Sequence, residues 1–224
     1  MGPDGSLQYP RRRPSLVGNP RSWNSGPETG SWAAEAGIDD VGFILELIDR
    51  WVEGGRADPQ RVYVTGFSNG SAMAFRVGAE LSQQVAAIAP VANGLLAPAP
   101  RLQRPVSLIM IWGEDDPLNP IEGGEVKRFG VTVTRPSGED SWRRWGELLN
   151  CTEEGLEAPA RAVTLLTQRG CAGGAEALFY RIAGLGHQWP GGKTYVGVVS
   201  GPGSDAIDAT QVIWSFFEKH SRTR

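Results

Sequence analysis

The sequence feature that most limits the possible folds is a Gly-x-Ser-x-Gly motif at residues 66–70. An apolar run at 62–64 precedes it, and a run of small residues compatible with a helix follows from Ser71. A sharp strand–turn–helix connection of this kind raises a serine hydroxyl above the edge of a sheet. We therefore expect Ser68 to be a nucleophile, with the backbone N–H of Asn69 at the start of the helix facing a developing oxyanion.

The two glycines of the motif fit this interpretation. We expect a Cβ at either Gly66 or Gly70 to crowd the strand against the helix, because the backbone of a nucleophile turn is tightly folded. The motif by itself leaves an alternative open, in which an ordinary turn joins a strand to a helix and Ser68 only caps that helix.

A serine nucleophile needs a base, and the chain offers two histidines. His187 lies in the glycine-rich loop 184–192, directly after the apolar strand pattern 177–183. His220 lies four residues from the last residue, and a cation near a helix end is the better interpretation there. We therefore expect His187 to be the base, with a purely structural histidine as the alternative.

The orienting acid is expected between the serine and the histidine, since the order serine, acid, histidine is typical of this arrangement. Residues 106–112 form a long apolar run that predicts a buried parallel strand, and three adjacent acids, Glu114, Asp115 and Asp116, follow it. We choose Asp116, because the proline after it stiffens its loop, with Asp115 as the second choice. Either residue could instead be a solvated turn acid.

Together these motifs resemble a known family. The matching segments are 39–43, 58–70, 87–92 and 186–192, the last continuing into 205–217. Over roughly residue 23 to the end, the chain resembles secreted polyhydroxybutyrate depolymerases and feruloyl or acetylxylan esterases. That resemblance implies an α/β-hydrolase fold, with a mostly parallel sheet flanked by helices, and ester hydrolysis through an acyl-enzyme without a cofactor.

The resemblance also bears on individual residues. It implies Ser68 as nucleophile and His187 as base, and it favours Asp116 over Asp115 because the family's acid stands in a His-Gly-Thr-x-Asp-Pro pattern. Two departures are visible: Trp112 replaces the histidine of that pattern, and Ile121 stands where an aromatic residue often follows the acid loop. We expect both departures to affect the pocket rather than the triad.

The first part of the chain differs in character from the rest. Residues 1–31 are rich in Pro, Gly, Ser and Arg and predict an irregular segment, whereas residues 32–224 predict a single catalytic domain. No apolar stretch follows Arg11–Arg13, so we recognise no secretory or twin-arginine signal. The resemblance implies earlier strands, including a loop with a second oxyanion donor. We therefore expect either a shortened member lacking some N-terminal strands or another source of that donor. Either the first thirty residues or a second copy of the chain could cover the sheet edge that is left open.

Charge and hydropathy argue against two kinds of partner, nucleic acid and membrane. A formal net charge of −3 over 224 residues, with an isoelectric point near 5.5, disfavours nucleic acid as a partner. No apolar run approaches membrane-spanning length. The expected substrates are short acyl esters, hydroxyalkanoate oligomers or polysaccharide-linked feruloyl or acetyl esters. The alternatives are an inactive remnant that acts as a binding protein, and a peptidase or acyltransferase on the same fold.

Four further residues have two interpretations each. Trp189 could stack on an aromatic or sugar part of the substrate or hold its loop in the core, and Leu95 could line an acyl pocket or pack in the core. Cys151 and Cys171 could be buried thiols, but the resemblance implies a disulfide between them and hence a secreted or periplasmic protein. Two cysteines without a nearby histidine pair do not predict a metal site.

Periodicity predicts the remaining elements. The expected helices cover 41–52, with Asp39 as cap and a stop at 54–55, then 72–81, a helix opening at 136–140 with Trp142 and Trp145 on its apolar side, and finally 205–219. Strands are expected at 85–91 and 162–167 in addition to those named above.

Overall fold

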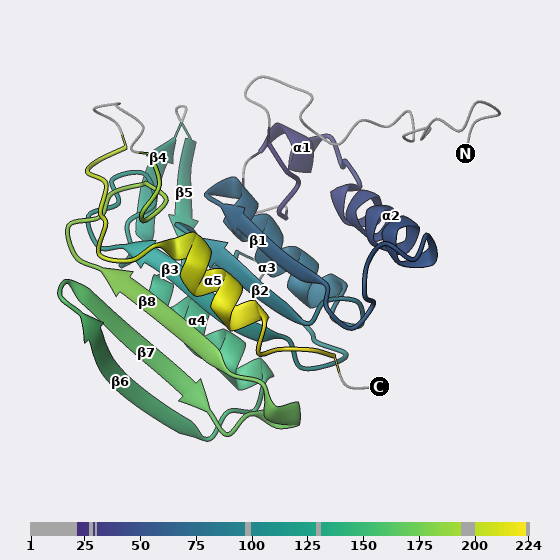
Figure 1. The fold of residues 1–224 in the computed structure, drawn as a ribbon. Helices are drawn as coiled ribbons and strands as arrows, with labels where there is room; N and C mark the ends of the chain where they lie inside the picture. The colour runs from purple at the N-terminus through teal and green to yellow at the C-terminus, as the bar shows by residue number, and fades with distance from the viewer. Residues whose placement is uncertain are drawn as a thin grey trace.

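The computed structural model describes residues 22–26, 29, 31–96, 100–128, 131–193 and 200–222. Its centre is a six-stranded sheet in the order β1-β2-β3-β8-β7-β6 (Figure 1). The first four strands of that order are parallel, and β7 and β6 continue the sheet in antiparallel fashion. The bounds are β1 Tyr63–Phe67, β2 Ala87–Val91, β3 Ser107–Gly113, β6 Glu153–Ala160, β7 Val163–Arg169 and β8 Ala177–Ile182. The mostly parallel sheet predicted from the sequence is confirmed.

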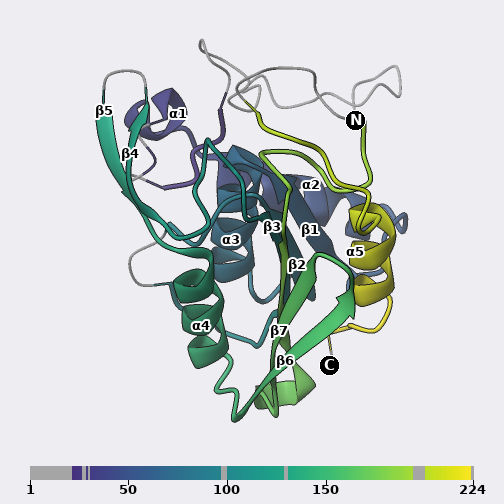
Figure 2. The same cartoon turned by 90° about the vertical axis from the view of Figure 1, so that its left-hand side faces the viewer.

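Helices cover both faces of this sheet. Figure 2 shows α3 and α4 on one side and α5 on the other. The bounds are α1 Trp32–Glu35, α2 Asp40–Glu53, α3 Asn69–Glu80, α4 Gly138–Leu148 and α5 Ala209–Phe217, with a short 3-10 turn η2 at Ala172–Gly174. A separate antiparallel pair, β4 Gly124–Arg128 and β5 Val131–Arg135, projects beside the sheet.

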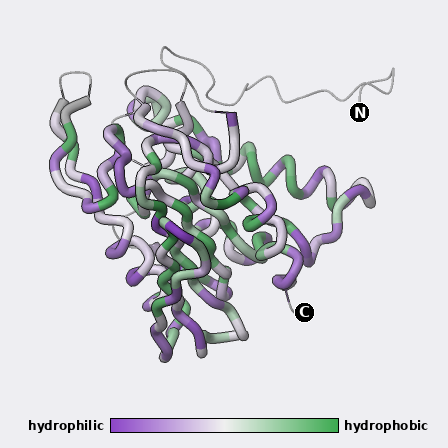
Figure 3. The backbone as a smooth tube through the Cα atoms, turned by 60° about the vertical axis from the view of Figure 1, so that its left-hand side comes forward, coloured by the Kyte–Doolittle hydropathy of each residue, from purple (hydrophilic) through white to green (hydrophobic). Residues whose placement is uncertain are grey.

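The hydrophobic core lies along the central strands. Every residue of β2 and β3 is buried, which is the pattern of parallel strands covered on both faces, and Figure 3 shows hydrophobic segments gathered in the middle of the molecule. The apolar side of α4 enters this core as predicted. Trp142 and Trp145 are buried, and their indole N–H groups donate to the carbonyls of Ala177 and Val106, both at 2.9 Å. Each tryptophan therefore satisfies its one polar atom inside the core.

Capping side chains mark where these helices begin, and one of the predicted starts is wrong. Asp39 accepts a hydrogen bond from the Gly42 N–H at 2.8 Å and begins α2, which ends at Gly54 as predicted. The last helix begins at Ala209 rather than at the predicted Asp205, because Asp208 is its cap. The residues before this cap lie in a loop, in which the carbonyl of Ser204 accepts from the Gly191 N–H at 2.9 Å.

Strand β6 carries no strand signal in the sequence. All eight of its residues are exposed, and they include three glutamates, a glycine and a proline. It forms a strand because its backbone pairs with that of β7, from Glu153 opposite Arg169 to Ala160 opposite Val163. Side-chain periodicity cannot report a strand that forms through backbone pairing.

The outer edge of β1 has no neighbouring strand among the described residues. A groove of about 740 Å³ runs along it between α2 and α5, and apolar side chains dominate its lining. Trp51 and Trp214 line this groove with half or more of their surface exposed, at 50% and 56%. Whether the first thirty residues, most of which lie outside the described ranges, or a second copy covers this edge stays open as the sequence left it. No helix within the described ranges is long and apolar enough to cross a bilayer.

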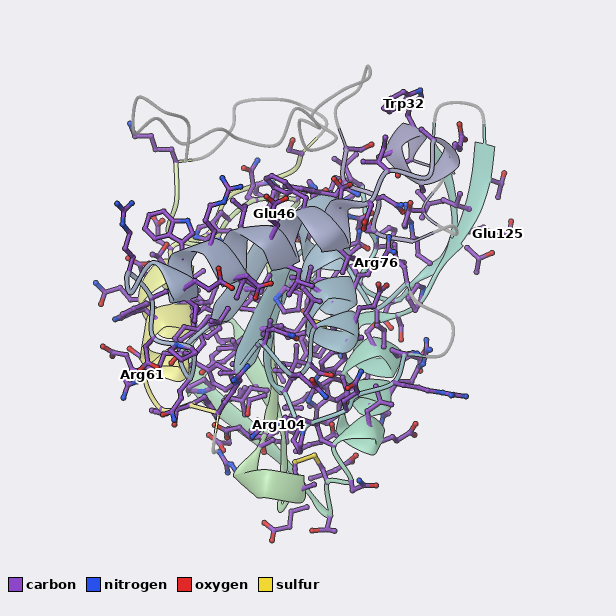
Figure 4. All side chains as sticks on the ribbon, turned by 90° about the vertical axis from the view of Figure 1, so that its right-hand side faces the viewer. Trp32, Glu46, Arg61, Arg76, Arg104 and Glu125 are labelled. Atoms are coloured by element: carbon purple, nitrogen blue, oxygen red, sulfur yellow. A yellow bond between two sulfur atoms is a disulfide. The ribbon has the colours of Figure 1, made fainter. Side chains whose placement is uncertain are left out.

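A disulfide joins Cys151 to Cys171, as the resemblance implied. Cys151 follows α4, and Cys171 lies between β7 and β8, before the first residue of β8. Figure 4 shows the bond in yellow at the end of the molecule opposite Trp32. Because His187 comes after the last residue of β8, the strand separates the disulfide from that loop.

We expect the double variant Cys151→Ser, Cys171→Ser to lower the free energy of unfolding by about 3 kcal/mol, the value for a loop of this length. The bridge spans 20 residues of sequence, and without it the unfolded chain regains that freedom. Urea unfolding of the wild type and variant, both without reductant, measures the difference. Wild type treated with reductant is the control and should match the variant; equal stability with and without the bridge would contradict this role.

Candidate active site

Ser68 occupies the sharp turn between β1 and α3. Its backbone angles are φ 57° and ψ −115°, a region that residues with a Cβ rarely adopt. Its N–H donates to the Val91 carbonyl at 2.9 Å, which ties the turn to the end of β2. Its carbonyl accepts from the N–H groups of Ser71 and Ala72 and so opens the helix. The predicted strand–turn–helix context is therefore present.

The two glycines of the motif behave differently. A Cβ on Gly66 would collide with the carbonyl of Gly70, so the prediction of crowding holds at Gly66. A Cβ on Gly70 would meet no atom within 4 Å, so the same prediction is wrong at Gly70. Gly70 is the second residue of α3, and its missing side chain would point into open space while its carbonyl faces Gly66.

His187 joins the turn to the acid loop. Its Nε2 lies 2.8 Å from Ser68 Oγ, and its Nδ1 lies 2.8 Å from Asp116 Oδ2. With the Nδ1 proton donated to the carboxylate, Nε2 is free to accept the serine proton, which is the tautomer that a base requires. The structure thus brings together three residues that are 48 and 71 positions apart in the chain, at the carboxyl ends of β1, β3 and β8.

Asp116 is held by its own loop. Its side chain is fully buried, and Oδ1 accepts the backbone N–H groups of Leu118 at 2.9 Å and Asn119 at 2.8 Å. Oδ2 is thereby left to face the imidazole. The second choice, Asp115, has an exposed side chain, and its N–H donates to the Leu185 carbonyl. Of the two candidates, only Asp116 contacts His187.

The loop that carries His187 is anchored by the segment at 200–204. The N–H of His187 donates to the Ser200 carbonyl at 2.6 Å, and the N–H of Gly186 donates to the Pro202 carbonyl at 2.8 Å. A Cβ on Gly186 would collide with the same Ser200 carbonyl, so only glycine permits this approach. Phe67 packs beside the imidazole, with ring centroids 4.7 Å apart. Both ring position and ring tilt are therefore constrained.

Asn69 connects the Ser68 turn to the start of the described chain. Its Oδ1 accepts the Trp23 N–H at 2.5 Å, and its Nδ2 donates to the Trp23 carbonyl and to Ser25 Oγ. The backbone N–H groups of Asn69 and Gly70, in the first turn of α3, have no acceptor among the described residues. Two donors at a helix start are thus available beside Ser68. No sequence signal distinguished the segment around Trp23, which reads as loop.

The remaining predicted site residues, Leu95 and Trp189, make their contacts elsewhere than with Ser68, Asp116 and His187. Leu95 is 1% exposed and packs in the hydrophobic core, which is the alternative that the sequence left open. Trp189 is partly buried; its indole N–H lies 3.1 Å from Thr210 Oγ1, and it lines the groove along β1. None of Ser68, Asp116 and His187 lines that groove. A substrate contact by Trp189 stays a prediction.

The second histidine lies just after the last residue of α5, near the helix end at which the sequence placed it. His220 Nδ1 is 2.8 Å from the Phe216 carbonyl, and Nε2 is 3.4 Å from Glu176 Oε1. The hydrogen bond from His220 holds the pKa of Glu176 below its usual value, against the opposing effect of burial. Within the described ranges, no group of three histidine, cysteine, aspartate or glutamate side chains is placed to hold a metal ion.

The glycine difference predicts opposite results for two neighbouring substitutions. Gly66→Ala should lower the free energy of unfolding by about 1–3 kcal/mol, the usual cost of overpacking, because a backbone carbonyl cannot move aside. Gly70→Ala should leave it unchanged or raise it by up to about 1 kcal/mol, since alanine favours a helix. Urea unfolding of both variants checks this. Equal destabilisation at both positions would contradict the geometry.

Comparison with known proteins shows which proteins this chain resembles. A family model described as phospholipase/carboxylesterase matches residues 26–129. A Nocardia uniformis subsp. tsuyamanensis protein named "Putative esterase NocK" is 30% identical over 193 residues, covering 79% of this chain and 56% of its own length. Feruloyl esterase B of Piromyces equi is 28% identical over 184 residues, covering 77% of this chain and 32% of its own.

Two further likenesses are weaker. A bifunctional acetylxylan esterase/xylanase, XynS20E of Neocallimastix patriciarum, is 31% identical over 84 residues, covering 37% of this chain and 12% of its own. The crystal structure of a thermostable esterase has 14% identity and a TM-score of 0.48, covering 82% of this chain and 37% of that one.

The chain thus spans about half or less of the length of the relatives it matches. The family model includes the Ser68 turn, and the two longer alignments cover more than three quarters of the chain. From its sheet and its strand–turn–helix motif, the chain has an α/β-hydrolase-like fold, and over more than three quarters of its length it is similar in sequence to a putative esterase and a feruloyl esterase.

Proposed function

We propose that the protein is a serine esterase that hydrolyses carboxylic esters through an acyl-enzyme. The observation that carries this proposal is the pair of 2.8 Å contacts made by His187, one to Ser68 Oγ and one to Asp116 Oδ2. A hydroxyl, an imidazole and a carboxylate in this order form the arrangement that activates a serine for acyl transfer. The esterase relatives support the same reaction class.

Each side chain has one role in the proposed reaction. Ser68 Oγ attacks the ester carbonyl while His187 Nε2 takes its proton, and the protonated imidazole then gives that proton to the departing alcohol. Water repeats the sequence on the acyl-enzyme, forming the acid and restoring the Ser68 hydroxyl. Asp116 keeps the imidazole oriented and stabilises its charged form. No step requires a cofactor.

The developing oxyanion is assigned to the N-terminus of α3. The N–H of Asn69 follows the nucleophile directly and is available, and the helix dipole adds positive potential at the same end. Removal of one such donor typically costs about a hundredfold to a thousandfold in rate. The side-chain contacts of Asn69 with Trp23 and Ser25 hold this donor in place.

The substrate class is carboxylic esters, either small or polymer-linked. We propose short acyl esters, hydroxyalkanoate oligomers and feruloyl or acetyl esters on polysaccharides, since matched relatives carry feruloyl and acetylxylan esterase names. Trp189 is the proposed stacking residue for an aromatic or sugar part. The Cys151–Cys171 bridge supports function in an oxidising compartment, secreted or periplasmic.

Removing the nucleophile tests the proposal directly. Ser68→Ala should lower kcat on p-nitrophenyl acetate and butyrate by at least about a thousandfold, because the acyl-enzyme cannot form. Ser82→Ala is the matched control: this buried serine follows α3 at the far end from the turn and should leave the rate unchanged. Rates are followed by release of p-nitrophenol. If Ser68→Ala hydrolyses both esters as fast as wild type, the serine mechanism is wrong.

A further inference from the structure

Asn119 closes the loop that carries Asp116. It is 2% exposed, and both of its backbone groups contribute to the loop. Its N–H donates to Asp116 Oδ1 at 2.8 Å, and its carbonyl accepts from the indole N–H of Trp112 at 2.9 Å. Trp112 is the last residue but one of β3 and is itself 1% exposed. The loop is therefore fixed to its own strand from inside the core.

The side chain of Asn119 extends to a different strand. Its Nδ2 donates to the Ala92 carbonyl at 2.8 Å. Ala92 directly follows β2 and has φ 59°, a conformation that turns the chain sharply at the strand end. Asn119 thus bridges the end of β3 to the end of β2 beyond the last backbone pairs of the sheet.

The turn after β2 in turn contacts the nucleophile. Asn93 Nδ2 donates to the Ser68 carbonyl at 3.3 Å, and the Asn93 carbonyl accepts from Ser71 Oγ at 2.8 Å. Asn93 is 4% exposed, and its Oδ1 accepts the Gly94 N–H at 2.9 Å. Both sides of the Ser68 peptide unit therefore contact the end of β2, since the Ser68 N–H donates to Val91.

These contacts form a continuous path from Asp116 to Ser68 that does not pass through His187. We propose that Asn119 is a positioning residue for the proposed ester hydrolysis, on which this inference rests. It aims the Asp116 carboxylate at the imidazole and sets the separation between the acid loop and the nucleophile turn. Displacing catalytic groups by about 1 Å can cost about a hundredfold in rate.

Only one of the two polar side-chain atoms of Asn119 is hydrogen-bonded, which supports a role beyond packing. Its Oδ1 is buried and accepts no hydrogen bond from the described residues. An unmet buried acceptor costs free energy that an apolar side chain of similar size avoids. Any stabilisation that the Asn119 side chain provides through hydrogen bonding therefore comes from the bond that Nδ2 donates to Ala92, and not from Oδ1.

Two substitutions at this position test the inference. Asn119→Ala removes the bridge, and Asn119→Asp keeps the shape but replaces the donor with an acceptor facing the Ala92 carbonyl. We expect Asn119→Ala to lower kcat on p-nitrophenyl butyrate by about tenfold to a hundredfold with little change in KM. Asn119→Asp should lower kcat at least as far. Wild-type kcat in either folded variant would overturn the proposal.

A double-mutant cycle separates positioning from general loosening. In an Asp116→Ala background, Asn119→Ala should change kcat by less than about twofold, because the group it positions is gone. An equal loss in both backgrounds would overturn the proposal. Gln168→Ala is the matched control, because this carboxamide is also buried and its oxygen also has no hydrogen-bond partner among the described residues. Gln168 pairs with the first residue of β8, whereas His187 follows the last. Its loss should therefore leave kcat unchanged.

The outcomes are distinct from those of the proposed function. Urea unfolding establishes which variants fold; if one Asn119 variant does not fold, the other decides, and if neither folds, Asn119 is a structural residue and the proposal is overturned. Activity that survives Ser68→Ala ends the proposed function itself. An inactive Ser68→Ala together with fully active Asn119 variants ends only the positioning inference.

Discussion

The site depends on one buried imidazole whose two nitrogens both need partners. His187 is 8% exposed, and it finds those partners only because a carboxylate and a hydroxyl stand on opposite sides of its ring, each at 2.8 Å. Neither partner is a neighbour in sequence. A buried polar ring with one nitrogen unmet would destabilise the loop that carries it. The fold must therefore bring three strand ends to one point, or the imidazole is left without one of its two partners.

Parallel strands supply that convergence. Because β1, β2, β3 and β8 run in the same direction, the loops at their carboxyl ends lie along one edge of the sheet. The loops also approach one another closely. The backbone at Gly113, the end of β3, lies so near the Leu185 carbonyl that a Cβ on Gly113 would collide with it. The strained Ser68 backbone persists because its N–H and carbonyl are both held from the end of β2. The hydrogen bonds from the end of β2 thus hold Ser68 in its strained conformation.

Much of this could be predicted from the sequence, for identifiable reasons. Buried strands such as 107–113 are continuous apolar runs, and Asp39 marks a helix start by its own hydrogen bond, so local chemistry reports both. Ser68, Asp116 and His187 each follow such a run. The choice of Asp116 over Asp115 rested first on the proline that follows it and then on the resemblance. In the structure only the Asp116 carboxylate is turned inward, and it contacts His187.

Other features depend on contacts that no local pattern records. Strand β6 exists through backbone pairing, and α5 begins late because its first predicted residues belong to the loop that holds the histidine. Gly70 follows the same motif as Gly66, yet only one of them lacks room for a Cβ. Asn119 and Asn93 resemble ordinary loop residues in sequence. Their side chains form these hydrogen bonds only because the fold places the ends of β1, β2 and β3 side by side.

The central claim is that Ser68 is an activated nucleophile, and covalent labelling tests it most directly. A fluorophosphonate reagent should add one phosphonyl group per chain, and peptide mass mapping should place it on Ser68. His187→Ala should slow the labelling strongly, because the hydroxyl loses its base. An unmodified Ser68 peptide in folded protein, or labelling that proceeds equally fast without His187, would contradict the account.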